Sequence, residues 1–274
     1  MSLANVLTTP KYELIPMKNV EATFAFIPQD VKVSVTVSPT KGIEATLELS
    51  QQLTHYVSPT HITPHLSARL LESEAQLRNI VQRLETLGIE ELFIVGGDTF
   101  PARGPFANSF ELVRAVREIN QDIRLGITAY PEGHPSITNE VLLEDLKRKA
   151  PLAQFMSTQL CFDARTIKTW LEQTRNAGVT LPVQIGIAGV VDMIKLTQIA
   201  SRIGVGDSLR YLSKHAAQVF KLVTGYKPDD VVQGLETLYD DPFYDIAGFH
   251  IYTFNQLEKT ERWRQQTLAG VLTT

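Results

Sequence analysis

Two carboxylate residues stand at positions where they could take part in proton or charge chemistry. Glu13 lies in a strand-forming segment, 12–15 (YELI), and Asp98 follows the apolar run at 92–95. A carboxyl group within an apolar strand is costly unless it is paired or protonated. Burial would also raise its pKa, which is the condition for a general acid. Glu13 is therefore a candidate acid if it faces inward, and a solvent-facing side chain is the alternative.

Asp98 stands where a buried parallel strand is expected to end. The apolar residues at 92–95 can hide both faces of a strand in a helix-covered sheet. Gly96 and Gly97 then allow the backbone to turn or to approach another group closely. Such a strand would deliver the Asp98 carboxylate to a ligand at its mouth. The alternative is an ordinary turn whose aspartate caps the next segment.

Two further segments carry histidines. In 129–135 (AYPEGHP), two prolines fix the backbone around Tyr130 and His134, so that a ring and an imidazole could be held against a flat ligand. Plain turn chemistry explains the same residues equally well. His61 and His65 are four apart in a predicted strand, which is too far along a strand for two ligands of one metal. The sequence therefore predicts no metal site.

Eight apolar, β-branched segments predict strands that alternate with amphipathic stretches such as 72–87 and 139–149. Most strand-helix units take about 30 residues, the length of a crossover between parallel strands. Eight such units favour closure into a (β/α)8 TIM barrel with extra helices (194–203, 208–223 and 229–239) before the last strand. An open doubly wound sheet is the alternative, although no GxGxxG follows the first strand. The predicted strands are 12–15, 31–37, 61–66, 92–95, 124–130, 154–162, 183–187 and 246–254.

Composition narrows the class of protein. The 274 residues, 43% hydrophobic and 20% charged, fit one domain over 1–274. A net charge of -4 without a basic stripe argues against nucleic acid or an anionic membrane as the main partner. The single cysteine excludes an internal disulfide and cysteine-rich metal sites. Because there is no signal-like start and no span of roughly 20 apolar residues, we expect a soluble cytoplasmic protein.

In a parallel barrel, functional residues gather at the carboxyl ends of the strands. Reading only those positions gives a polar set spread over all eight predicted strands. That set consists of Glu13, Thr36, His65, Asp98, Tyr130, His134, Gln159, the segment 186–189, Tyr252 and Asn255.

These residues resemble the methylenetetrahydrofolate reductase family, a flavin-dependent (β/α)8 barrel of one-carbon metabolism. The similar motifs follow the family's order over nearly the whole chain. They are YELIP (12–16), SVT (34–36), PHLS (64–67), GD (97–98), AYPEGHP (129–135), LKRK (146–149), TQLCFD (158–163) and FHIYTFN (249–255).

The resemblance implies that reduced FAD passes hydride to 5,10-methylenetetrahydrofolate to give 5-methyltetrahydrofolate, with NADH or NADPH as the donor. Glu13 matches the family's general acid, and Asp98 matches the carboxylate that stabilises the cationic intermediate. A folate is then the small-molecule partner, and assembly into a homo-oligomer is possible. The implied substrate contacts are Gln159, Tyr252 and Asn255, and the implied cofactor contacts are Thr36, His65, Gly97, Asp98, Tyr130, His134 and Lys149.

Four departures from the family pattern keep other functions open. Gly96 stands where an arginine usually precedes Gly-Asp, and Leu142 where an acidic flavin contact is expected. The segment 185–190 (IGIAGV) lacks the family's prolines, and Gln256 replaces an arginine. One alternative is a flavin-independent folate reductase that uses nicotinamide directly. The other is a tetrahydrofolate-binding or C1-transfer protein without redox activity.

Overall fold

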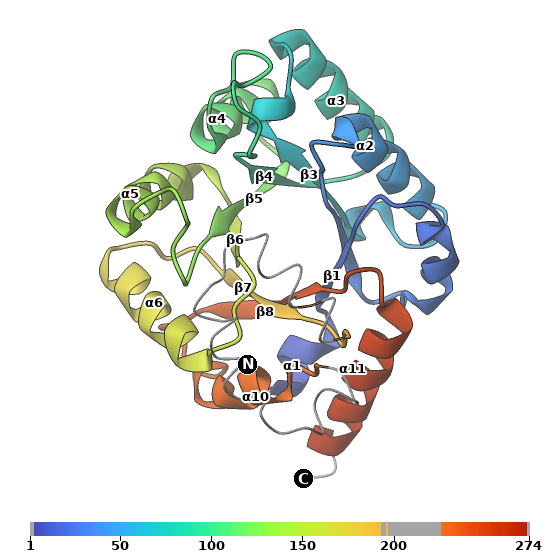
Figure 1. The fold of residues 1–274 in the computed structure, drawn as a ribbon, viewed down its shortest axis with the longest axis vertical. Helices are drawn as coiled ribbons and strands as arrows, with labels where there is room; N and C mark the ends of the chain where they lie inside the picture. The colour runs from blue at the N-terminus through green and yellow to red at the C-terminus, as the bar shows by residue number, and fades with distance from the viewer. Residues whose placement is uncertain (1–2, 193–195, 197–225, 273–274) are drawn as a thin grey trace.

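Eight parallel strands form one closed barrel in sequence order, in which β8 pairs with β1 (Figure 1). The computed structural model describes residues 3–192, 196 and 226–272. The predicted (β/α)8 TIM barrel is confirmed, and each predicted strand corresponds to an observed one. The strands are β1 (Lys11–Leu14), β2 (Lys32–Val35), β3 (Ile62–Ser67), β4 (Glu91–Val95), β5 (Arg124–Ala129), β6 (Phe155–Thr158), β7 (Val183–Ala188) and β8 (Ile246–Tyr252).

Helices surround the barrel, and no helix among the described residues is both long and apolar enough to cross a membrane. The α-helices are α1 (Leu3–Thr8), α2 (Gly42–Leu53), α3 (Glu74–Thr86), α4 (Ser109–Ile119), α5 (Asn139–Lys149), α6 (Ala164–Asn176), α10 (Asp229–Gly234) and α11 (Leu257–Leu272). The 3-10 helices are η1 (Val20–Phe26), η2 (Pro59–His61), η3 (Ala68–Leu70), η4 (Ala150–Leu152) and η5 (Glu236–Leu238).

The predicted helices meet different outcomes. The segment 72–87 becomes α3, and 139–149 becomes α5 with the same bounds. The segment 229–239 is interrupted after Gly234 and forms α10 and η5. Two further predicted helices, 194–203 and 208–223, lie outside the described residues.

Short polar side chains start the helices that follow the strands. Ser73, Asn108, Thr138 and Asp163 each accept a hydrogen bond from a backbone N–H in the first turn of α3, α4, α5 and α6, respectively. Such N-caps satisfy donors that the helix cannot pair internally. The helices then bury an apolar stripe against the strands, as the buried residues of α3 show. The caps together with the stripe fix where each loop at the mouth of the barrel ends and its helix begins.

The inside of the barrel is unusually polar for this fold, whose interior is commonly filled by branched apolar side chains. Lys11 on β1 pairs with Glu91 on β4, and its ammonium group lies 4.3 Å from the centre of the Phe155 ring on β6. Phe93 and Phe155 stack 6.2 Å apart. Gly126 makes room for both rings, because a Cβ there would lie 2.2 Å from Phe155 and 2.6 Å from Phe93. Polar and aromatic side chains therefore fill the centre.

Candidate active site

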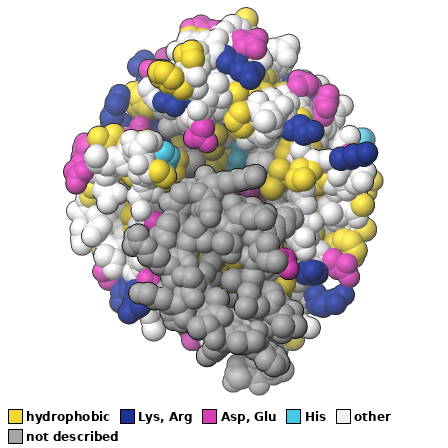
Figure 2. Space-filling model, in the orientation of Figure 1, with side chains coloured by type: hydrophobic (Ala, Val, Ile, Leu, Met, Phe, Trp, Pro, Cys, Tyr) yellow, Lys and Arg dark blue, Asp and Glu magenta, His cyan; other side chains and the backbone are white. Residues whose placement is uncertain are grey.

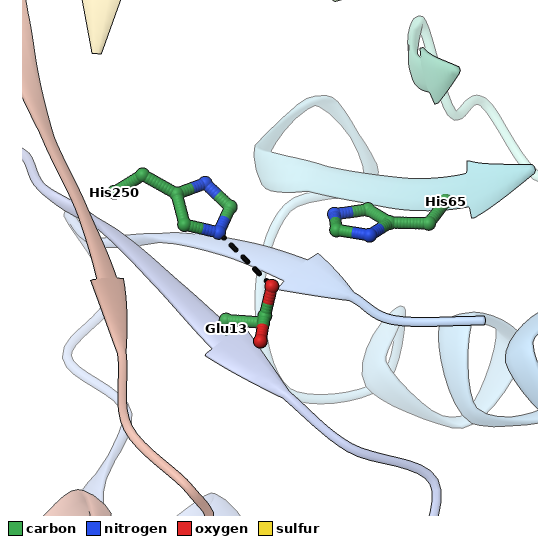
Figure 3. A group of neighbouring side chains, drawn as sticks. All are labelled: Glu13, His65 and His250. Carbon is green, nitrogen blue, oxygen red and sulfur yellow. Dashed lines mark hydrogen bonds and ion pairs between the residues drawn. The ribbon is translucent and has the colours of Figure 1, made fainter. Parts of the chain in front are cut away.

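A carboxyl group and two imidazoles meet inside the barrel (Figure 3). Glu13 reaches in from β1, His65 from β3 and His250 from β8. Oε2 of Glu13 lies 3.2 Å from Nε2 of His250. The three residues are 8%, 7% and 2% exposed, so the inward orientation of Glu13 replaces the solvent-facing alternative. Figure 2 shows histidine and hydrophobic side chains in a recess over the centre of the barrel.

Burial sets the protonation of this cluster. It raises the pKa of Glu13 to about 7, against a smaller opposing effect of His65. It lowers the pKa of His65 and that of His250 to about 3. Near neutral pH both imidazoles are therefore uncharged, while the Glu13 carboxyl group is close to its midpoint. A group that titrates near the working pH is suited to giving up and regaining a proton.

The same three side chains are of types that bind transition metals, and the structure describes no other group of this kind. No set of metal ligands was predicted, because the sequence analysis considered His65 together with the nearby His61 and not with the distant His250. A metal would require the Glu13 carboxylate, whereas burial favours the neutral acid. We therefore interpret the cluster as a proton site.

Neighbouring side chains hold the two imidazoles and keep water away. Nε2 of His65 lies 2.5 Å from Oγ of Ser34 on β2. The His65 ring packs 4.7 Å from Phe93, and the His250 ring packs 4.9 Å from Tyr252. This aromatic surround is the physical cause of the desolvation that displaces the pKa of Glu13.

The end of β8 also fixes the backbone that carries Glu13. The Thr253 hydroxyl donates to the Glu13 carbonyl at 2.5 Å. The Asn255 amide accepts from the N–H of Ile15 and donates to its carbonyl, both at 2.9 Å. Asn255 takes a left-handed backbone conformation to do so, with φ 59°. The oxygen and the nitrogen of the Asn255 amide therefore both tie the end of β8 to the end of β1. The substrate contact predicted for Asn255 stays a prediction.

Tyr252 and Gln159 lie next to each other at the mouth. The Tyr252 hydroxyl donates to the carbonyl of Thr158 at 3.1 Å, and the Gln159 N–H continues the ladder to Ala129. Gly186 permits this approach, because a Cβ there would lie 2.2 Å from the Thr158 carbonyl oxygen and 2.9 Å from the Tyr252 ring. Oε1 of Gln159 accepts from the N–H of Leu160 at 2.9 Å, which orients the amide.

Asp98 lies in the loop after β4 and is exposed. Gly97 before it has φ 85°, and a Cβ there would lie 2.1 Å from Oγ of Ser67. Electrostatic effects connect the loop to the barrel centre. Asp98 contributes to the raised pKa of Tyr130, behind burial, and Tyr130 and Glu13 both contribute to the raised pKa of Tyr252. Asp98 and Glu13 therefore each raise the pKa of a tyrosine at the carboxyl ends of the strands, Tyr130 and Tyr252, respectively.

A second group of predicted residues borders a pocket of about 210 Å³ beside β5, α5 and α6. Tyr130, Lys149, Leu142 and Trp170 are among its lining residues. Nζ of Lys149 lies 2.6 Å from Oδ2 of Asp145 and donates to Oγ of Ser109 at 3.1 Å. The Lys149 ammonium is thus already neutralised within the protein.

The remaining predicted contacts lie at the same mouth. The His134 ring packs edge-on against Tyr130 at 5.5 Å, and its Nδ1 accepts from the N–H of Ser136. Thr36 directly follows β2, where its N–H donates to the carbonyl of Leu14 and extends the pairing with β1. The structure thus gives two groups, one around Glu13 and one around Tyr130.

His250 was missed by the sequence analysis, although a signal for it was present. In 249–255, residues at alternate positions share one face of the strand, so His250 faces the same way as Tyr252. Tyr252 was predicted to face the ligand, and the same reasoning applied to His250 places it inside the barrel.

Comparison with known proteins finds one family over most of the chain. A family model for methylenetetrahydrofolate reductase matches residues 17–266. "Methylenetetrahydrofolate reductase 2" of Saccharomyces cerevisiae is 26% identical over 166 residues, which are 58% of this chain and 27% of that protein. "Probable methylenetetrahydrofolate reductase (NADPH)" of Caenorhabditis elegans is 26% identical over 189 residues, which are 64% of this chain and 28% of that protein.

The chain therefore covers little more than a quarter of these two relatives. Among solved structures, tryptophan synthase from M. tuberculosis aligns with a TM-score of 0.49 and 11% identity over 98% of this chain and 94% of its own. The matched family region begins at residue 17, so Glu13 lies just before it, and the position of Glu13 rests on geometry. Because the family model accounts for nearly the whole barrel, the chain belongs to the methylenetetrahydrofolate reductase family.

Proposed function

We propose that this chain interconverts 5,10-methylenetetrahydrofolate and 5-methyltetrahydrofolate by hydride transfer. The observation that carries the proposal is the buried Glu13 carboxyl group with a pKa of about 7, in a barrel of this family. Opening the methylene-bridged ring of the substrate requires a proton for the amine that leaves. It also requires negative charge near the iminium cation that forms.

The two carboxyl groups differ in the way that this chemistry demands. Glu13 holds a proton inside the barrel, where water is excluded, and gives it to the leaving amine. Asp98, exposed at the mouth, presents a carboxylate to the cation. Two titratable groups whose environments give them different protonation states at one pH can divide the acid and anion roles.

Other residues at the mouth orient the folate. Oε1 of Gln159 is held by the Leu160 N–H, which directs the amide nitrogen of Gln159 as a donor for the pterin. The Tyr252 ring lies between His250 and the Thr158 carbonyl and forms a wall of the site. Tyr252 and Asn255 stay predicted substrate contacts.

The residues beside β5 fit a flat cofactor such as a flavin. Tyr130 and Trp170 offer aromatic surfaces in the pocket. Bound FAD would supply the hydride that NADH or NADPH provides. The residues proposed to hold it are Thr36, His65, Gly97, Asp98, Tyr130, His134 and Lys149.

The test is an assay of the purified protein for both half-reactions, with and without added FAD. We expect oxidation of methyltetrahydrofolate or reduction of the methylene form, and Glu13→Gln should suppress folate turnover by about 10²- to 10⁴-fold. Reduction of bound flavin by NADH or NADPH should remain in that variant. A protein with no hydride transfer to folate under either condition would overturn the proposal, and equal loss of both half-reactions would contradict the acid role.

A flavin-independent reductase is the second candidate, favoured by the region around Lys149. The ammonium group of Lys149 is paired with Asp145, and Leu142 contributes an apolar side chain to the same pocket. Both features reduce the charge available to a cofactor. A colourless preparation that still transfers hydride from nicotinamide to folate would select this function. A folate-binding protein without redox activity would instead bind tetrahydrofolate in calorimetry and transfer no hydride.

The cytoplasmic location, the single domain over 1–274 and a homo-oligomer stay predictions. Gel filtration with light scattering would determine the oligomeric state directly.

A further inference from the structure

We propose that His250 is the positioning residue for the acid: its Nε2–H donates to Oε2 of Glu13 and so leaves the acid's proton on Oε1. This inference rests on the proposed function, because it assigns the orientation of the proton that Glu13 delivers. His250 itself does not act on the substrate. Its role is to decide which carboxyl oxygen is the donor.

The hydrogen bond itself is the first observation. Nε2 of His250 and Oε2 of Glu13 are 3.2 Å apart, and both side chains are more than nine-tenths buried. Within the described part of the chain, this is the only side-chain hydrogen bond of the Glu13 carboxyl group. Oε2 is thus engaged by the protein, while Oε1 is the oxygen left for a ligand.

The second observation is the other nitrogen of the same ring. Nδ1 of His250 is buried, and no described residue offers it a hydrogen-bond partner. A neutral imidazole carries its hydrogen on one of the two nitrogens. A buried N–H without an acceptor is rarer in proteins than an under-used acceptor, because it loses a full hydrogen bond to water. The hydrogen therefore belongs on Nε2, where Oε2 of Glu13 accepts it.

Carboxyl chemistry then fixes the acid proton. A neutral carboxyl group has one carbonyl-like oxygen and one hydroxyl oxygen. The oxygen that accepts from His250 is the carbonyl-like one, so the hydroxyl lies on Oε1. Thr253 holds the carbonyl of Glu13 and Asn255 holds the backbone of Ile15, and this restricts how far the carboxyl group can turn away.

Other titratable groups around the pair are engaged elsewhere. His65 on β3 meets Ser34, and Lys11 in the neighbouring layer is paired with Glu91. Tyr252 donates to a main-chain carbonyl. Lys11 and Glu91 act on the pKa of His250 in opposite directions, after burial, so neither replaces its hydrogen bond to Glu13.

Two substitutions at position 250 separate positioning from packing. His250→Gln keeps an N–H donor and removes the ring, whereas His250→Phe keeps a ring and removes the donor. We expect His250→Gln to retain kcat for the folate half-reaction within about 3-fold, and His250→Phe to lower it by about 10²-fold, the lower range for loss of general acid catalysis. KM should change little in both. The matched controls are His55→Gln and His55→Phe in the exposed turn after α2, which should leave kcat unchanged.

A second measurement does not depend on turnover. Carbon-13 NMR of the Glu13 carboxyl group in ligand-free protein should give a pKa that is higher in His250→Phe than in wild type, because the lost donor favoured the carboxylate. His250→Gln should titrate like the wild type. An equal pKa of Glu13 in His250→Phe and in the wild type would overturn the positioning role. A His250→Phe variant that is active while His250→Gln is inactive would overturn it as well. If the NMR difference is present but the wild type turns over no folate, the positioning stands and the proposed function fails.

Discussion

Two buried polar clusters lie one above the other inside the barrel, and they start from residues only two apart on β1. Lys11 pairs with Glu91, which also accepts from the Thr63 hydroxyl at 2.7 Å. The Glu13 carboxyl group instead has two neutral imidazoles, those of His65 and His250, as its neighbours. The pKa of Glu91 is about 2, because nearby ammonium groups and hydrogen bonds outweigh its burial. The pKa of Glu13 is about 7, because nothing outweighs its burial.

The contrast shows that burial alone does not decide what a carboxyl group does. The partner decides it. An ammonium partner keeps Glu91 ionised over the physiological pH range, so it is a structural anion. Neutral partners let the proton of Glu13 move near neutral pH, so it can serve as an acid. We call the Lys11–Glu91 pair the lower cluster and the group of Glu13, His65 and His250 the upper cluster. We expect the lower cluster to determine the stability of the fold and the upper cluster to determine its proton chemistry.

The largest effect is expected from breaking the lower pair. Lys11→Met leaves the Glu91 carboxylate buried without its closest cation, so the free energy of unfolding should fall by about 3–5 kcal/mol. Urea unfolding followed by circular dichroism measures this. The double variant Lys11→Met/Glu91→Gln removes the stranded charge and should recover most of the loss. If Lys11→Met alone were as stable as the wild type, the Lys11–Glu91 pair would not contribute to the stability of the barrel.

Glu13→Gln should change stability in the opposite direction. The folded-state pKa of about 7 lies above the ordinary glutamate value of 4.5, so the folded protein holds a proton that the unfolded chain releases. The associated stability is complete below pH 4.5 and is lost as the pH rises through 7. Glutamine cannot ionise, and the variant should gain about 3 kcal/mol over the wild type at pH 8 and almost nothing at pH 4.5. Thermal unfolding at both pH values tests this, and a pH-independent difference would contradict it.

Asp98→Asn should affect turnover without affecting stability, because Asp98 is exposed. We expect folate turnover to fall by about 10-fold, because the proposed role of its carboxylate is to stabilise the forming cation. The melting temperature should stay within the error of the wild type. An aggregated or unfolded variant would instead indicate that Asp98 caps the loop after β4.

The smallest expected effect is that of metal removal. If the upper cluster handles protons, dialysis against EDTA should leave both turnover and the Glu13 titration unchanged. Added Zn²⁺ should inhibit, because it would bind the carboxylate and displace the proton. Activity that disappears with EDTA and returns with Zn²⁺ would contradict the proton interpretation of the cluster.

The sequence was sufficient for the barrel and for two of the three residues around Glu13, but it pointed to neither member of the Lys11–Glu91 pair. Apolar runs separated by about 30 residues predicted all eight strands, and an acid within an apolar strand pointed to Glu13. Lys11 was missed because the predicted first strand began one residue later. His250 was missed because its partner lies 237 residues away, and the register between β1 and β8 follows only from closure of the barrel.

Intramolecular partners of some predicted site residues could not be foreseen. Both ends of the Asn255 amide are bound to Ile15. Lys149 pairs with Asp145 one helical turn earlier. The ligand contacts expected of both residues stay predictions. Such intramolecular partners depend on packing and rotamers, which residue type and spacing do not specify.

The attachment of the end of β8 to β1 has a consequence for the newly made chain. Glu13 is synthesised before its anchors His250, Thr253 and Asn255, which follow it by more than 230 residues. Until those anchors dock, neither the backbone nor the carboxyl group of Glu13 has its final place. We therefore expect the site around Glu13 to be assembled only when β8 pairs with β1.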